Sequence, residues 1–236
     1  VYRAIDQRDG TVVAIKEIPL RGLDAAALRA ITVETDLLSS LSHPNVVAYL
    51  GTVETKSYRY IVLELAENGS LAGVVRKYGC FPEALVAMYM RQVLDGLEWL
   101  HSHGVCHGDV KGANLLITKE GHVKLADFGV ARRLSDATEQ GAPSSVVGTP
   151  FWMAPELLAG ESNSQASDVY GLGMLCWECF ARDVPYADHK GKSTRDILLE
   201  VRSDETKLRP TISAEMRRSA PTGVVQLIED CLLHNP

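Results

Sequence analysis

Three oxygen-bearing side chains occur within a short stretch of this chain, at a spacing that suits metal and hydroxyl chemistry. Asp109 lies five residues before Asn114 in the segment HGDVKGANLL, and Asp127 follows Asn114 by thirteen residues in LADFGVA. Mg²⁺ takes few protein oxygens and completes its coordination shell with water and phosphate oxygens. The stretch therefore predicts a site that holds a metal ion and orients a hydroxyl group.

Two short apolar runs are expected to bring these side chains together. Residues 115–117 (LLI) follow Asn114 directly, residues 123–126 (VKLA) lead into Asp127, and the polar run TKEGH separates the two. This pattern predicts an antiparallel hairpin, whose strand ends lie side by side. The alternative is that these residues only form turns, where Asp, Asn and Gly are common.

The order and spacing of these motifs resemble those of the eukaryotic protein kinases, and the resemblance runs from the first residue to the last. It implies an α+β fold with two lobes that form one kinase domain. Residues 1–66 would form a small N-lobe of mainly antiparallel strands with one helix, and residues 67–236 a larger, mainly α-helical C-lobe. It also implies ATP and Mg²⁺ as cofactors, with Asn114 and Asp127 holding the metal ions and Asp109 accepting the proton of the substrate hydroxyl.

A lysine and a glutamate are expected to fix the ATP phosphates. Residues 11–20 (TVVAIKEIPL) alternate like a strand, which places Lys16 on the same face as Ala14. Such a lysine is usually solvated, but the resemblance assigns it to the α- and β-phosphates. Residues 25–41 have helical spacing, and within them Glu34 matches the family's partner for that lysine, although it could be an ordinary surface glutamate. The pair forms only when the helix swings inward.

The resemblance also assigns the adenine site. Leu63 occupies the gatekeeper position, and the backbone groups of residues 64–66 would meet the adenine edge. Val1, Ala14 and Leu116 match the apolar residues above and below the ring. The expected nucleotide-binding residues are Val1, Ala14, Lys16, Glu34, Leu63, Glu64, Leu65, Ala66, Leu116 and Asp127.

Lys111 and Thr149 indicate the type of substrate hydroxyl. Lys111 occupies the position at which the resemblance separates serine/threonine kinases from tyrosine kinases, and its ammonium would neutralise charge on the transferred phosphoryl group. Residues 148–156 (GTPFWMAPE) resemble the substrate platform of serine/threonine kinases, in which Thr149 would bond to Asp109 and Lys111. The expected catalytic residues are Asp109, Lys111, Asn114 and Thr149.

Packing around the site is also implied by the resemblance. Asp168 is expected to accept backbone N–H bonds from the catalytic loop, and its place near a helix start also suits a capping role. Four residues match a stack that couples the two lobes of the family: Leu38, Leu50, His107 and Phe128.

Two departures from the family pattern affect the functional interpretation. Gly108 replaces the arginine that normally grips a phosphate on the activation loop. Arg132 and Arg133 are substitute partners for a phosphate, or simply solvated; the candidate phosphate carriers are Thr138, Ser144 and Ser145.

The second departure concerns the two ends of the chain. The chain begins at the last valine of the glycine-rich GxGxxGxV pattern and stops before the family's C-terminal Arg-Pro segment. We therefore expect a fragment of a longer protein.

The phrases KGANLL, TKEGHVKLADFGVA, SVVGTPFWMAPE and ENGSL narrow the resemblance to the STE group. They are most similar to mitogen-activated protein kinase kinase kinases of the epsilon-like branch, related to septation-initiation kinases. The implied function is a signalling kinase whose partner is a protein substrate, often another kinase. A pseudokinase scaffold is the alternative that Gly108 and the absent glycine-rich loop would favour. A second alternative is a phosphotransferase that acts on small molecules. Such an enzyme would not need the GTPFWMAPE platform, so its presence argues against that alternative.

Composition is consistent with a globular protein, and the cysteine pattern favours a cytoplasmic location. The 236 residues are 46% hydrophobic and 23% charged. The net charge of −6 argues against nucleic acid or anionic membranes as partners. We expect no membrane span and no signal peptide; the oligomeric state is left open.

Cys176 and Cys179 form a CxxC motif within an apolar run. The run predicts a buried helix, in which the two thiols stay free in a reducing compartment.

The glycine at position 108 generates a prediction about control. Treatment of the active protein with a protein phosphatase should leave most of its activity, because Gly108 has no side chain to hold a phosphate. The measurement is phosphoryl transfer before and after treatment, with inhibited phosphatase as the control. Complete inactivation by the phosphatase would contradict the prediction.

Overall fold

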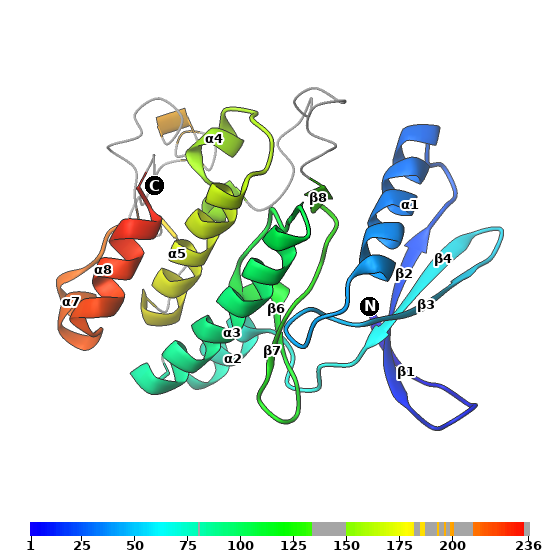
Figure 1. The fold of residues 1–236 in the computed structure, drawn as a ribbon, viewed down its shortest axis with the longest axis horizontal. Coiled ribbons are helices and arrows are strands. Elements are labelled where there is room, and N and C mark those ends of the chain that lie inside the picture. The colour runs from blue at the N-terminus through cyan, green and yellow to red at the C-terminus, as the bar shows by residue number, and fades with distance from the viewer. Residues whose placement is uncertain are drawn as a thin grey trace.

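The computed structural model describes residues 1–79, 81–133, 150–181, 185–186, 193, 196, 199–200 and 210–233. The fold class is α+β, as predicted: an antiparallel sheet with one helix forms the small lobe and helices form most of the larger lobe (Figure 1). Among the predicted functional positions, Thr138, Ser144, Ser145 and Thr149 lie outside the described residues.

The small lobe is a four-stranded antiparallel sheet with the order β1-β2-β4-β3. Its strands are β1 (Tyr2–Ile5), β2 (Val12–Pro19), β3 (Tyr49–Glu54) and β4 (Tyr58–Glu64). Helix α1 (Ala25–Ser40) lies beside the sheet (Figure 1) and confirms the predicted helix. The Asp24 carboxylate accepts a hydrogen bond of 2.8 Å from the Ala27 N–H, which satisfies one of the free donors at the helix start.

The larger lobe is built around two long helices, α3 (Glu83–Ser102) and α5 (Gln165–Ala181). Around them lie α2 (Leu71–Tyr78), α4 (Pro155–Leu158), α7 (Ala214–Ser219) and α8 (Thr222–Cys231), with the 3₁₀ turns η1 (Gly112–Asn114) and η3 (Pro150–Trp152). As predicted, the Ser70 hydroxyl caps α2 by accepting a bond of 3.2 Å from the Gly73 N–H. Among the described residues, no helix is long and apolar enough to cross a bilayer.

Two small sheets carry the catalytic segments. Strands β6 (Leu115–Ile117) and β7 (Val123–Leu125) form the predicted antiparallel hairpin. Strand β5 (Val105–Cys106) pairs with β8 (Arg132–Arg133), which joins the chain before the HGD triplet to the chain after the DFG triplet. The Asn45 amide donates 2.9 Å to the Val123 carbonyl, which links the loop before β3 to the hairpin.

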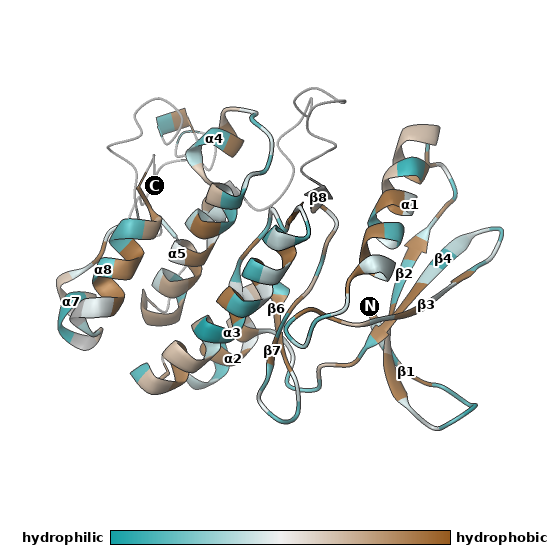
Figure 2. Ribbon diagram, viewed as in Figure 1, coloured by the Kyte–Doolittle hydropathy of each residue, from teal (hydrophilic) through white to brown (hydrophobic). Residues whose placement is uncertain are grey.

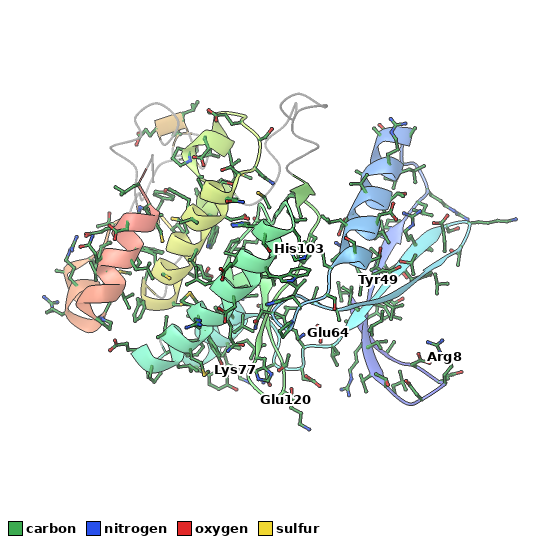
Figure 3. All side chains as sticks on the ribbon, viewed as in Figure 1. Arg8, Tyr49, Glu64, Lys77, His103 and Glu120 are labelled. Carbon is green, nitrogen blue, oxygen red and sulfur yellow. The ribbon has the colours of Figure 1, made fainter. Side chains whose placement is uncertain are left out.

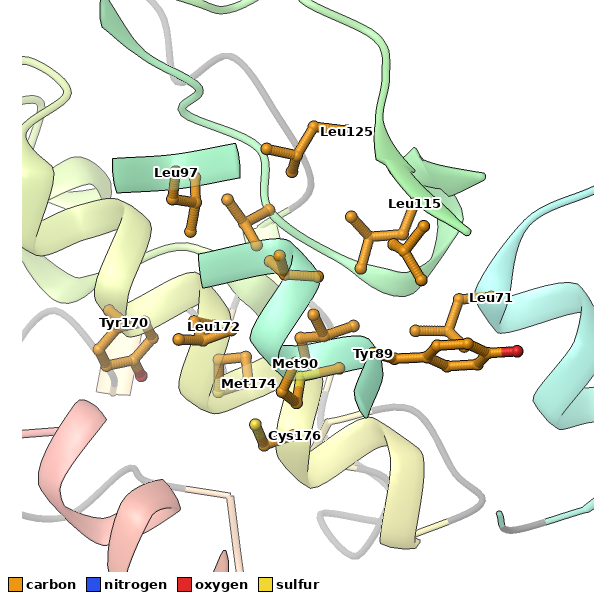
Figure 4. Packing of buried hydrophobic residues seen from close by; sticks show 14 of the residues in the cluster. Leu71, Tyr89, Met90, Leu97, Leu115, Leu125, Tyr170, Leu172, Met174 and Cys176 are labelled. Atoms are coloured by element: carbon orange, nitrogen blue, oxygen red, sulfur yellow. The ribbon is translucent and has the colours of Figure 1, made fainter. Parts of the chain in front are cut away.

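The core of the larger lobe lies between α3 and α5. Apolar and polar residues alternate around α3 (Figure 2), and its predicted apolar stripe is confirmed because Tyr89, Val93, Leu97 and Leu100 are buried and Leu85 packs at the edge. Met90 of α3 lies close to Met174 and Cys176 of α5 (Figure 4). The predicted burial of the two CxxC thiols of α5, Cys176 and Cys179, is confirmed, and neither forms a disulfide among the described residues.

One residue of the predicted interlobe stack is corrected. Leu50 is 52% exposed, whereas its neighbour Tyr49, on β3 (Figure 3), packs against the core. Successive strand residues point to opposite faces, so an assignment displaced by one residue selects the wrong face. The register between β3 and β4 also shifts between Tyr49 and Gly51, which the sequence pattern did not reveal. The stack prediction for Leu50 is therefore wrong.

The close approach of α3 to the hairpin generates a stability prediction. A Cβ atom at Gly96 would lie 2.9 Å from Leu125 Cδ1 and 3.1 Å from the Asn45 carbonyl oxygen. Gly96→Val should therefore lower the free energy of unfolding by about 1–3 kcal/mol through overpacking, although valine has the better helix propensity. The measurement is chemical denaturation, with Glu98→Val at an exposed position of α3 as the control. Equal stability of the two variants would contradict the close packing.

Candidate active site

The expected catalytic residues Asp109, Lys111 and Asn114 are in direct contact. The turn η1 folds the chain back after Lys111, so that the Asn114 amide donates to Asp109 Oδ2 at 2.8 Å and to the Asp109 carbonyl oxygen at 2.9 Å. The Lys111 ammonium donates to the same carboxylate oxygen. The Asp109 and Lys111 side chains are only 11% and 13% exposed. Two donors on one oxygen fix the orientation of the carboxylate.

The backbone of this catalytic loop is held by Asp168, as predicted. Its carboxylate is 1% exposed and accepts bonds of 2.8 Å from the His107 and Gly108 N–H groups. His101 Nε2 lies 2.8 Å from the same carboxylate. The capping role predicted for Asp168 is wrong, because Asp168 lies within the first turn of α5 and Ser164 precedes the helix.

His101, Cys106 and Asp168 also resemble a metal-binding cluster, since their potential ligand atoms lie within 4.8 Å of one another. Burial, with a smaller contribution from the Asp168 charge, raises the pKa of the Cys106 thiol to about 12, which keeps it neutral. Both Asp168 oxygens already accept backbone hydrogens. We therefore interpret the cluster as a structural support for the backbone of the catalytic loop and not as a metal site.

Lys16 bridges the small lobe and the DFG segment. Its ammonium lies 2.7 Å from Glu34 Oε1 of α1 and 3.1 Å from Asp127 Oδ1. Burial works to lower the pKa of Lys16, but the charges and hydrogen bonds of Glu34 and Asp127 outweigh it, so the net pKa is raised. The lysine therefore stays cationic, and α1 is in its inward position. The predicted Lys16–Glu34 pair is present.

The position of Asp127 is fixed by its neighbours on both sides. The Ala126 N–H donates 2.9 Å to the Asn114 carbonyl oxygen, and the ring of His107 lies 3.1 Å from the Ala126 carbonyl oxygen. On the other side, the Phe128 ring centroid is 4.9 Å from that of His107, and both side chains are buried. Asp127 itself has φ of 62°, a conformation uncommon for a non-glycine residue. This backbone turn separates its side chain from the buried ring of Phe128.

Asn114 and Asp127 fit a magnesium site by the chemistry of their donors. The Asn114 amide nitrogen is bound to Asp109, which directs the amide oxygen away from that residue. The Asp127 side chain is 56% exposed, and one of its oxygens accepts from Lys16. An amide oxygen and a carboxylate are ligands that Mg²⁺ takes readily.

The expected adenine residues surround the junction between β4 and the β6–β7 hairpin. Ala14 is buried opposite Leu63 in the β2–β4 register, and Leu63 and Leu116 are half-buried against the core. The hinge residues 64–66 are half-buried. Val1 is 86% exposed, so its contact with adenine stays a prediction.

The Glu64 side chain ties this hinge to the larger lobe. Its carboxylate accepts a hydrogen bond of 2.6 Å from the Ala48 N–H and forms an ion pair of 2.7 Å with Lys124 Nζ of β7. Figure 3 shows Glu64 at the junction of the two lobes. Glu64 was expected only to offer backbone groups, so the sequence missed this second contribution.

Glu178 is a functional candidate that the sequence interpretation missed. Its carboxylate accepts 3.1 Å from the Gly112 N–H and 3.0 Å from Trp152 Nε1. Burial raises the pKa of Glu178, against the opposing effects of these hydrogen bonds and the Lys111 charge. It thereby joins the catalytic loop to the described end of the predicted substrate platform. A lone acid within the apolar run GLGMLCWECFA was the signal that could have identified it.

Comparison of the sequence with known proteins identifies the family to which the chain belongs. The protein kinase domain family matches residues 1–236, so the chain belongs to the protein kinase family. It is 48% identical over 190 residues to MAP3K epsilon protein kinase 1 of Arabidopsis thaliana and 50% identical over 186 residues to cytokinesis protein sepH of Emericella nidulans; these alignments cover 80% and 79% of the chain and 14% of each relative. It is 44% identical over 188 residues to cell division control protein 7 of Schizosaccharomyces pombe, covering 80% of the chain and 17% of that relative.

The predicted resemblance to epsilon-like and septation kinases is thus confirmed. The chain spans about a seventh of the length of the first two of these relatives.

The ion pair between the lobes generates a prediction. Glu34→Gln should reduce kcat/KM for ATP by about 10- to 100-fold, the effect of losing a charged hydrogen bond worth about 1.5–3 kcal/mol, because Lys16 loses its anchor on α1. Steady-state kinetics measure the loss. Asp36→Asn, which removes an exposed carboxylate from the same helix, is the control and should have no comparable effect. Unchanged kinetics in Glu34→Gln would contradict an anchoring role.

Proposed function

We propose that the protein is a serine/threonine protein kinase that transfers the γ-phosphoryl group of ATP to protein hydroxyls, with another kinase as a substrate. The observation that carries the proposal is the contact of Asp109 with both Lys111 and Asn114, beside an intact Lys16–Glu34 pair. The relatives support it by name, since they include MAP3K epsilon kinases and a probable serine/threonine-protein kinase of Dictyostelium discoideum.

In this proposal Asp109 orients the substrate hydroxyl and accepts its proton. Its carboxylate is held from one side by the Asn114 amide, so it keeps one orientation as the hydroxyl approaches. The Lys111 ammonium lies at the same oxygen, where it can neutralise charge that develops on the transferred phosphoryl group. Thr149 would complete this set from the substrate platform, and Glu178 anchors that platform through Trp152.

The nucleotide would bind between the lobes. Lys16 would contact the α- and β-phosphates, and its ion pairs with Glu34 and Asp127 keep the ammonium in place. Asn114 and Asp127 would hold Mg²⁺, which when bound supplies positive charge to the phosphate oxygens. The backbone of residues 64–66 would meet the adenine edge, with Leu63 at the gatekeeper position, and the apolar residues Val1, Ala14 and Leu116 would enclose the ring.

The same proposal covers the organisation of the domain and its compartment. Residues 1–66 form the N-lobe and residues 67–236 the C-lobe of one kinase domain. A cytoplasmic location is supported by the cysteines that the structure describes, since Cys106, Cys176, Cys179 and Cys231 are buried and form no disulfide with one another.

The test is a radiolabel assay with ATP and Mg²⁺ on matched peptides that carry only serine, only threonine or only tyrosine as the acceptor. We expect transfer to serine and threonine and none to tyrosine. Asp127→Ala should abolish transfer and leave the protein folded, because the Asp127 side chain is more than half exposed; thermal unfolding checks the second point. Transfer to tyrosine alone would overturn the substrate class, and full activity of Asp127→Ala would overturn the metal role.

A further inference from the structure

The Asn163 side chain fills the space beside Gly108 that a side chain at position 108 would need. Gly108 has φ of +79°, and a Cβ atom built on it would lie 2.0 Å from the Asn163 Nδ2 atom. The same amide donates a hydrogen bond of 2.8 Å to the Val130 carbonyl oxygen. A side chain at position 108 and the Asn163 amide in this position therefore exclude each other.

Two independent features favour glycine at position 108 here. The positive φ strains any residue with a Cβ atom. The space that this atom would need is filled by the Asn163 amide and bounded by the Val130 carbonyl oxygen, 3.1 Å away. The sequence alone suggested a lost arginine at position 108. The structure shows that another polar side chain enters the space beside the same backbone.

The hydrogen bond from Asn163 joins two parts of the reaction centre. Val130 lies three residues after Asp127, at the start of the segment that leads to the substrate platform, and Asn163 lies five residues before Asp168. Asp168 holds the backbone of the HGD triplet. Residues 163–168 thus grip the catalytic loop with a carboxylate and the segment after Asp127 with an amide.

We propose that Asn163 is a positioning residue that fixes the start of the activation segment by a neutral hydrogen bond, in place of a side chain from residue 108. This proposal rests on the proposed kinase function for its kinetic consequences, although the contact itself does not. The backbone of residues 128–131 is then set without any negative charge on the segment. Asn163 acts through Val130 and does not touch the reacting groups.

The variant Asn163→Asp tests the hydrogen bond with little change in shape, because a carboxylate oxygen then faces the Val130 carbonyl oxygen in place of the amide donor. Asn163→Ala removes the side chain, and Gln165→Ala at an exposed position in the first turn of α5 is the matched control. Hydrogen exchange of residues 128–131 should accelerate roughly fivefold in both Asn163 variants, the scale of one lost hydrogen bond. Exchange is measured without nucleotide or metal.

The kinetic readout is kcat at saturating ATP and Mg²⁺, which should fall roughly fivefold in Asn163→Asp while KM for the peptide is unchanged. Exchange in α8, which contributes no residue to the contact between Asn163 and Val130, should not change. Normal exchange at 128–131 in Asn163→Asp would overturn the proposal, as would equal acceleration in α8, since that indicates general destabilisation. If the unmodified protein transfers no phosphate, the proposed function fails, but the exchange result still decides the role of Asn163.

A second pair of variants examines the shared space. Gly108→Ala should lower kcat more in the presence of Asn163 than in the Asn163→Ala background, because only the first protein must displace the amide. Equal losses in the two backgrounds would show that backbone strain at position 108 alone is responsible, and would overturn the steric part of the proposal.

Discussion

The reaction centre depends on the carboxylate of Asp168, which is buried and accepts the backbone hydrogens of His107 and Gly108. A charge in such surroundings is tolerated only when hydrogen bonds satisfy it. The N–H groups of the catalytic loop provide those bonds, so the loop and the carboxylate each fix the position of the other. Asp109 follows Gly108 directly, so these bonds also fix the position of the Asp109 backbone.

Helix α5 contributes a second acid to the same loop. Glu178 binds the Gly112 N–H, so two carboxylates of one largely apolar helix hold the loop before and after Asp109. The helix packs against α3 and α8 and most of its side chains are buried, so both carboxylates are anchored in the core of the larger lobe. The reacting side chains are therefore positioned by the core, whereas Lys16 reaches them from the other lobe.

Local patterns in the sequence were sufficient for much of this architecture. The stripe on α3 and the two apolar runs of the β6–β7 hairpin depend on short-range periodicity, and both were predicted. The stack was misassigned at Leu50 because a register shift in β3 has no local signature. Glu178 and Asn163 were missed for a related reason. Their partners lie 66 and 33 residues away, and only the folded chain brings them together.

The shared space at Gly108 constrains how this chain can change over generations. An arginine introduced at position 108 meets an occupied site, and the loss of Asn163 first leaves the Val130 carbonyl without that donor. If either single step lowers activity as proposed, the two positions are expected to change together. Related sequences that share this contact are therefore expected to keep both residues or to replace both.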